Sequence, residues 1–411
     1  MNTVDVLWIM VSAALVLLMV PGLALFYGGM GRSKNMLNML MMNMVCLGIV
    51  PVVWITVGYS LSSVGGNEWI GSLDAAFLQG IDYVDGDGGS PLLGVFFALT
   101  FACITPALIS GAVADRMKFS AWVAFVPLWL LLVFVPAWAW VFKSDGFLVS
   151  RGSLDFAGGT VVHVAAGAAA LALITVLGRR KNWPNQPMPP HNLPFTMLGA
   201  GILWFGWFGF NAGSAFAVDT VAVQAFVNTF IAGAVAMLSW LIVEKLVDGH
   251  ATSLGAASGI VAGLVGITPG AGFMGTWQAA VVGLVAGAVC ALAVRAKFKL
   301  NYDDAFDVVG VHLVGGLVGG ILIGFLADQS IFLGDDATAE EKAEAAQGLF
   351  AGGGSELLIE QVFANVSVLL FSFLVTLVLA YALKAVIGLR VTESEETLGL
   401  DEALHAESAY S

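Results

Sequence analysis

The sequence predicts an all-α integral membrane protein with eleven transmembrane helices. Of its 411 residues, 59% are hydrophobic and only 11% are charged, and the mean hydropathy is +0.90, which is outside the range of soluble globular domains. Apolar runs of the length that a helix needs to cross a bilayer, roughly 20 residues, recur through the whole chain. One polytopic bundle therefore explains the pattern better than a soluble domain with a membrane anchor.

The eleven helices are predicted in order along the chain. The first apolar run is expected to remain as a span, because residues 1–6 carry no basic segment and no small-residue cleavage site precedes PGLALFYGG. The expected spans are residues 7–29, 38–60, 92–113, 121–142, 156–177, 195–213, 221–243, 252–269, 276–294, 306–327 and 357–388.

The distribution of Lys and Arg predicts the orientation, because basic residues remain preferentially in cytoplasmic connections. One set of connections holds only Lys143, Arg151 and Lys342. The alternate set holds the others: Arg32, Lys34, Arg116, Lys118, residues 179–181, Lys245, Arg295, Lys297, Lys299, Lys384 and Arg390. We therefore expect the N-terminus outside and the C-terminus inside, as an odd number of spans requires.

The net charge of −13 does not indicate a basic or nucleic-acid partner. Many of the acidic residues fall in two expected external loops, 61–91 and 328–356, and in the C-terminal tail. A solvent-exposed surface explains acidic residues at these places. Cys46, Cys103 and Cys290 fall in apolar runs at no metal-ligand spacing and are expected to be small buried apolar side chains. The sequence predicts neither a metal site nor a cofactor.

Two histidines lie inside long apolar stretches at matching places. His163 follows Asp155 by eight residues in DFAGGTVVH, His312 follows Asp304 by eight in DAFDVVGVH, and glycine follows each closely, in HVAAG and HLVGG. The first motif falls on span five, which runs inward, and the second on span ten, which runs outward. The copies therefore form an inverted repeat of five plus five spans. This is a transporter architecture with its site near the midplane, where the two imidazoles are expected to meet.

A matched histidine pair at membrane depth favours a functional role. Ionisable groups there are rare and mark pathways for ions or protons, although an interhelical hydrogen bond is the simpler role for a single histidine. Two neutral imidazoles share one proton and offer a donor and an acceptor in line, which suits a small polar solute. They also titrate as a coupled unit, which suits proton relay.

Asp155 and a later aromatic segment are the other candidates. Helix capping would explain Asp155, which precedes an apolar helix, and a compatible second role is a fixed negative charge below an external cation site. The segment WFGWFGFNAGSAF sets several rings beside Ser214. Aromatic belts at the membrane interface explain most such clusters, but a ring face near a hydroxyl also holds a small cation.

Six segments together resemble the ammonium transporter family, the Amt/Mep/Rh superfamily, in its bacterial or archaeal Amt-type form, over essentially the whole chain. They are PGLALFYGGMGRSKN, FACITPALISGAVADRMKFSAW, LDFAGGTVVH, GWFGFNAGSA, GIVAGLVGITPGAGF and DDAFDVVGVH, and the tail GLRVTESEETLGLDEALHAESAY follows. The resemblance implies a transmembrane domain over 1–388, with pseudo-symmetric halves at about 1–180 and 195–328 plus span eleven, and a cytoplasmic region over 389–411. It also implies a homotrimer in the cell membrane with one hydrophobic pore per subunit.

The resemblance also implies roles for individual residues. The external ammonium site corresponds to Phe101, Trp207 and Ser214, with Asp155 as the essential aspartate of span five. The stacked phenyl gate corresponds to Phe101 and Phe210, with Phe97 beside it, and the twin-His pair corresponds to His163 and His312. At one position the chain departs from the pattern: many bacterial members have a Trp late in span four, where AWAWVFKSDGF supplies Phe142, with Trp140 two residues away.

The function that the resemblance implies is ammonium transport. NH4+, or methylammonium as its analogue, is recognised outside and loses its proton, and NH3 crosses a dry pore while the proton is relayed separately. Alternatives are a passive gas channel of the Rh type and an ammonium sensor. An intramembrane hydrolase is disfavoured because the sequence has no HExxH or GxSxG motif, so no enzyme is predicted. The composition of the acidic tail leaves order and disorder both open. The resemblance implies that the tail packs on the cytoplasmic face, contacts the neighbouring subunit and couples to a PII-type regulatory protein.

Overall fold

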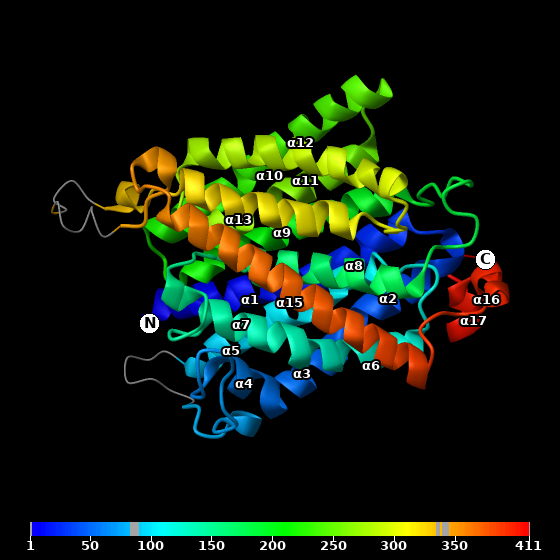
Figure 1. Cartoon of the computed structure of the whole chain (residues 1–411), viewed down its shortest axis with the longest axis horizontal. Helices are drawn as coiled ribbons and strands as arrows, with labels where there is room; N and C mark the ends of the chain where they lie inside the picture. The colour runs from blue at the N-terminus through cyan, green and yellow to red at the C-terminus, as the bar shows by residue number, and fades with distance from the viewer. Residues whose placement is uncertain (1, 83–89, 334–337, 339–344, 411) are drawn as a thin grey trace.

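Eleven helices in the structure are long and apolar enough to cross a membrane, which confirms the predicted number. The computed structural model describes residues 2–82, 90–333, 338 and 345–410, so parts of the two predicted external loops lie outside the described residues. The spans are α1 (Thr3–Met30), η1 with α2 to α4 (Ser33–Ser63), α5 (Pro91–Ser110), α6 to α7 (Phe119–Phe142), η6 and α8 (Gly159–Leu177), α9 and η7 (Leu193–Ala215), α10 (Thr220–Asp248), α11 and η8 (Ser253–Gly270), α12 (Thr276–Leu300), η9 and α13 (Val309–Leu326) and α15 (Glu356–Val386). The N-terminus and the C-terminus lie at opposite ends of this bundle (Figure 1).

Four spans contain a π-helical turn. Two of these turns, η2 (Trp54–Gly58) and η4 (Leu130–Phe134), begin three residues after Pro51 and Pro127, which remove a backbone donor from the helix. The other two, η6 (Gly159–Val164) and η9 (Val309–Leu313), contain the two predicted histidines. Wide turns of this kind are frequent at functional sites in helices.

The two histidine segments cross each other reciprocally. The turn η6 contacts α13 (Val314–Leu326), and η9 contacts α8 (Ala165–Leu177). Each histidine is followed four residues later by a glycine at the crossing: a Cβ on Gly167 would clash with Leu313, and one on Gly316 would lie 3.0 Å from Val164. Small residues let helix backbones approach closely in lipid, which explains the glycines that follow the histidines in both copies.

The C-terminal tail is folded rather than extended. Its helices α16 (Glu393–Leu398) and α17 (Leu400–His405) lie against the end of the bundle that is opposite the N-terminus (Figure 1). The Asp401 carboxylate accepts the free N–H groups of Leu37 and Asn38, at 3.0 and 2.8 Å, at the start of α2 (Met36–Met44). Capping of one helix by another segment satisfies donors that would otherwise be left without partners, so the tail is part of the fold.

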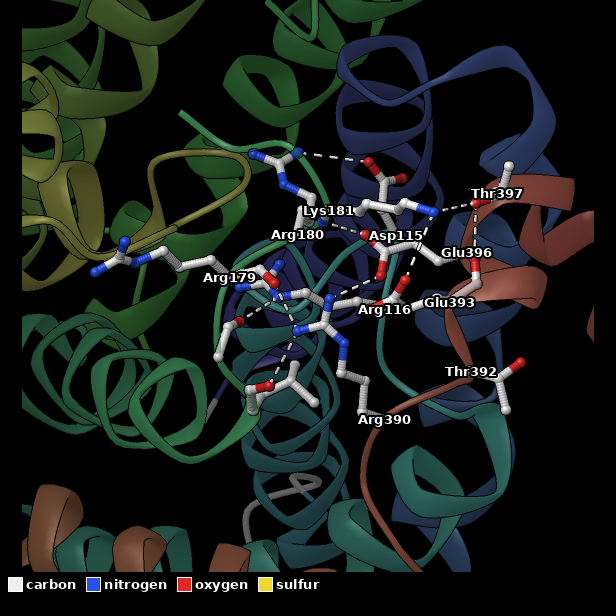
Figure 2. Close-up of polar contacts among 12 residues, drawn as sticks. Asp115, Arg116, Arg179, Arg180, Lys181, Arg390, Thr392, Glu393, Glu396 and Thr397 are labelled. Atoms are coloured by element: carbon white, nitrogen blue, oxygen red, sulfur yellow. Dashed lines mark hydrogen bonds and ion pairs between the residues drawn. The ribbon is translucent and has the colours of Figure 1, made fainter. Parts of the chain in front are cut away.

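A network of charged side chains ties the tail to the connection after α8 (Figure 2). Arg390 bonds the carbonyl of Arg179 at 2.6 Å and the carboxylate of Glu396 at 2.7 Å. The backbone N–H of Lys181 donates to the same Glu396 carboxylate at 2.7 Å. Glu396 is 1% exposed, and charge-assisted bonds to a buried carboxylate are the stronger ones.

Candidate functional site

A cavity of about 270 Å³ lies near the N-terminal end of the bundle, and we call it the aromatic cavity. Four helices, α4, α5, α7 and η7, contribute to its walls, together with the residue after η7 and the segment before η6. Most lining side chains are aromatic, and Ser214 and Ser63 supply hydroxyls. Ser214 Oγ donates to the carbonyl of Phe210 at 2.9 Å, which leaves its oxygen able to accept a second bond. The lining residues are Tyr59, Ser63, Gly94, Phe97, Ala98, Phe101, Trp138, Phe142, Phe156, Ala157, Ser214 and Phe216.

Two phenyl rings close the floor of the aromatic cavity. The centroids of Phe101 and Phe210 lie 4.2 Å apart with an angle of 35° between the ring planes, and Phe97 meets Phe101 edge-on at 5.0 Å. Phe101 lines the aromatic cavity, whereas Phe210 lines a smaller cavity beyond it. This tilted ring pair therefore separates the two spaces.

The smaller cavity, which we call the histidine cavity, measures about 10 Å³, roughly the space of a single water-sized molecule. Apart from the histidine and tryptophan nitrogens its walls are apolar: it is lined by Met19, Leu23, Phe26, Ile104, Leu108, Val162, His163, Leu203, Trp207, Phe210, Val261 and His312. A space of this size with such walls admits a small neutral solute and gives a cation very little solvation.

The structure brings the two predicted histidines together. The Nδ1 atoms of His163 and His312 lie 3.3 Å apart, the ring centroids are 5.3 Å apart, and the two side chains are 1% and 3% exposed. Because each neutral imidazole has one donor and one acceptor nitrogen, this contact holds a single proton. Nε2 of His163 is buried and has no hydrogen-bond partner among the described residues, so it is available to a solute in the cavity.

The structure places Trp207 beside the histidine pair. Trp207 does not line the aromatic cavity; its ring lines the histidine cavity, 5.4 Å from the ring of His163, and its Nε1 donates to Thr268 Oγ1 at 2.8 Å. Trp207 comes seven residues before Ser214 on the same span, which is roughly 10 Å along a helix. One short motif therefore spreads over both cavities.

Asp155 caps a helix in the structure. Its carboxylate accepts three backbone N–H bonds, from Gly158 at 2.8 Å, Gly159 at 2.7 Å and Thr160 at 2.8 Å, at the start of η6. The turn requires a left-handed residue, supplied by Gly158 with φ of 95°. The side chain is absent from the lining of the aromatic cavity, although Phe156 and Ala157 beside it are present. Asp155 therefore acts on the geometry of η6 and on the local field.

Span four supplies two aromatic residues to the cavity, and one of them was not predicted. Phe142 lines the cavity, and so does Trp138, whose ring is 4.6 Å from Phe142 and 6.1 Å from Phe101. Trp140 instead packs on Trp69. A spacing of four residues puts Trp138 and Phe142 on one face of α7 (Val135–Phe142), a signal that the sequence already contains.

Comparisons with known proteins agree with this architecture. A model of the Ammonium Transporter Family matches residues 7–410. An ammonium transporter of Mycobacterium bovis is 50% identical, over 99% of this chain and 90% of the relative. The crystal structure of Candida albicans Mep2 superposes with a TM-score of 0.86 at 31% identity, over 95% of this chain and 87% of that chain. A structure described as a Sensor Amt Protein superposes with a TM-score of 0.87 at 28% identity, over 97% of each chain.

These matches extend over all eleven spans and over the tail. The relatives are membrane transporters, and the spans of this chain are those of a multi-pass protein of the cell membrane. Since the family model and the relatives cover almost the whole chain, the chain belongs to the Ammonium Transporter Family.

Proposed function

We propose that the chain transports ammonium by binding NH4+ in the aromatic cavity, removing its proton and conducting NH3 past the histidine pair. The observation that supports this most directly is the order of the spaces: an aromatic cavity with serine hydroxyls in its wall, two tilted rings in contact, and a small cavity with apolar walls and paired imidazoles. In this proposal the N-terminal end of the bundle faces outside, as the basic residues predict.

The aromatic cavity suits a small cation. Ring faces attract ammonium through their quadrupole, and the attraction gains when water is partly excluded. Ser214 supplies an acceptor oxygen at the cavity wall, and Phe101 and Trp138 supply rings. Although Asp155 accepts three backbone N–H bonds, its carboxylate still adds negative charge near the start of η6. This charge favours a cation in this half of the pore.

Beyond the rings, the charged form becomes unfavourable. Moving a full cation through an apolar pore costs several kcal/mol, whereas NH3 crosses without a charge. In the histidine cavity NH3 meets a donor and an acceptor, and the shared Nδ1 proton of His163 and His312 gives a route for a separately relayed proton. Potassium has no proton to release, so the same step selects against it.

Two alternative functions, a gas channel and a sensor, predict different experimental results. A passive gas channel would move NH3 without net charge. A sensor would bind ammonium without transport, and the likeness to a Sensor Amt Protein is the reason to test this function.

We also propose that the chain forms a homotrimer in the membrane. Several spans carry exposed apolar side chains, for example Leu246 at 79% and Val378 at 70%, which fit contact with lipid and with neighbouring subunits. The folded tail fits docking of a PII-type partner at the inner face.

The test is a current measurement on protein reconstituted into a supported membrane. An ammonium pulse should give a transient current and an equal potassium pulse should give none. Methylammonium serves as the analogue for uptake. Absence of an ammonium current, with ammonia flux retained, would replace the proposal by the gas channel; absence of both, with ammonium binding retained, would replace it by the sensor.

A further inference from the structure

The two copies of the histidine motif differ at their aspartates. Asp304 has the same offset from His312 as Asp155 has from His163. Asp155 accepts three backbone N–H bonds through both oxygens, whereas Asp304 accepts one, from Val309 to Oδ2 at 2.6 Å. The other oxygen of Asp304, Oδ1, is buried and has no hydrogen-bond partner among the described residues, and the residue is 1% exposed. One copy therefore has a saturated carboxylate, and the other has a free oxygen.

The cations near Asp304 are engaged elsewhere. Lys297 Nζ bonds the Asp307 carboxylate at 2.6 Å and only the main-chain carbonyl of Asp304, at 3.1 Å. Arg180 holds the Asp303 carboxylate, with one bond at 2.8 Å. Arg116 donates to three carbonyls, one of which belongs to Asp303. The Asp304 carboxyl thus has no ion pair within the described part of the chain.

A buried carboxylate with an unbonded oxygen and no direct ion pair is unfavourable, and a proton removes the charge. Burial, reinforced by the charge of Asp307, outweighs the opposing charge of Lys297 and the backbone N–H groups and raises the pKa of Asp304 to about 6. Asp304 lies between α12 and η9, outside the spans themselves. Because its partner Val309 is the first residue of η9, the carboxyl sits at the start of the turn that contains His312.

We propose that Asp304 is a second proton-carrying residue of the transport cycle, taking up the proton that leaves the histidine pair and returning it to ammonia at the inner end of the pore. This rests on the proposed function. As NH4+ gives its proton to one nitrogen of the histidine pair, another N–H bond of the pair breaks, directly or through water, and an O–H bond forms on Asp304. That O–H bond then breaks as an N–H bond forms on NH3. NH4+ leaves, the carboxylate is restored, and no other reactant is consumed.

The test compares Asp304→Asn with Asp307→Asn in reconstituted protein. Asparagine keeps the size of either side chain and removes its ability to carry a proton at neutral pH. Asp307 is the matched control because it lies in the same connection and pairs with Lys297: its replacement removes a nearby charge and so lowers the pKa of Asp304, but it leaves the Asp304 carboxyl in place. We expect the ammonium current of Asp304→Asn to fall by about tenfold or more, and that of Asp307→Asn to stay within about threefold. Equal loss in both variants, or a wild-type current in Asp304→Asn, would overturn the proposal.

Infrared spectroscopy of the wild type provides a readout that a purely structural role would not change. A band of a protonated, buried carboxyl should disappear as the pH is raised through about 6, and Asp304→Glu should shift this band while retaining it. A band that is unchanged in Asp304→Glu would contradict the assignment even if Asp304→Asn fails to fold. If the wild type itself gives no ammonium current, the electrogenic function fails, and the infrared titration still decides whether Asp304 takes up a proton.

Discussion

The Nδ1 atoms of His163 and His312 face each other at 3.3 Å, so one imidazole must donate to the other. The contact joins two segments that are 149 residues apart in sequence. The two neutral rings must therefore have different tautomers: one has its proton on Nδ1 and the other has it on Nε2. A solute on one side of the pair thus meets a different hydrogen-bonding face from a solute on the other side.

Replacing either histidine with alanine should abolish ammonium transport or change its selectivity, because the single-proton contact requires both rings. We expect the ammonium current of His163→Ala and of His312→Ala to fall by about tenfold or more, or a potassium current to appear. Size-exclusion chromatography should show an oligomer that elutes as the wild type does. Unchanged ammonium uptake and unchanged potassium exclusion in both variants would contradict the role of the pair.

Phe142→Trp should strengthen ammonium binding in the aromatic cavity. Trp offers the best ring face for a cation, and the gain of about 0.5–1 kcal/mol for a partly exposed site corresponds to a roughly two- to fivefold lower half-saturating concentration. The current is recorded as a function of ammonium concentration. Trp140→Phe is the control, since Trp140 is not part of the cavity wall. An equal shift in both variants would indicate an indirect effect on span four.

Trp207→Leu should affect conduction and leave recognition intact, because the ring contacts His163 and not the aromatic cavity. We expect the half-saturating ammonium concentration to stay within about twofold while the maximal current falls by about tenfold. Phe142→Leu should raise the half-saturating ammonium concentration and leave the maximal current nearly unchanged. A large rise in the half-saturating ammonium concentration of Trp207→Leu would instead show that Trp207 takes part in the external ammonium site.

Asp303→Asn should destabilise the folded protein at neutral pH. Burial raises the pKa of Asp303, but the Arg180 hydrogen bond and the Arg116 and Arg180 charges outweigh burial and lower it overall. This stabilisation is present above the ordinary Asp pKa, near 3.9, and is lost as the pH falls through the lower folded value. Breaking a buried pair of this kind costs about 3–5 kcal/mol. Thermal unfolding in detergent should show the deficit at pH 7 and a smaller one below pH 4; a constant deficit would contradict the ionic explanation.

The sequence predicted the features that depend on composition and spacing. The number of spans follows from the length of the apolar runs, and the meeting of His163 and His312 follows from two equal offsets on spans of opposite direction. Span boundaries depend on more than apolar length: the sequence predicts an end of the ninth span at residue 294, but the helix extends to Leu300, because the basic residues at its end continue the helix into the polar region.

What the sequence did not predict depends on contacts between distant segments. The depth of Trp207 is decided by which way its helix faces, and its partner Thr268 comes from another span. The difference between Asp155 and Asp304 cannot be read from their identical offsets, because it depends on how many backbone N–H groups converge on each carboxylate. The placement of Trp138 follows from helical spacing, but only the cavity shows which face of α7 matters.

The glycines at the crossing of the two histidine segments restrict how the molecule can move. With no room for even a methyl group at Gly167, the segments are locked at their closest approach. A rocking motion of one half against the other, as in alternating-access carriers, would pull the imidazoles apart and break the contact on which proton sharing depends. Under the proposed function, solutes would therefore pass through a frame whose helices keep their places, and the opening between the two cavities would come from rotation of rings such as Phe101 and Phe210.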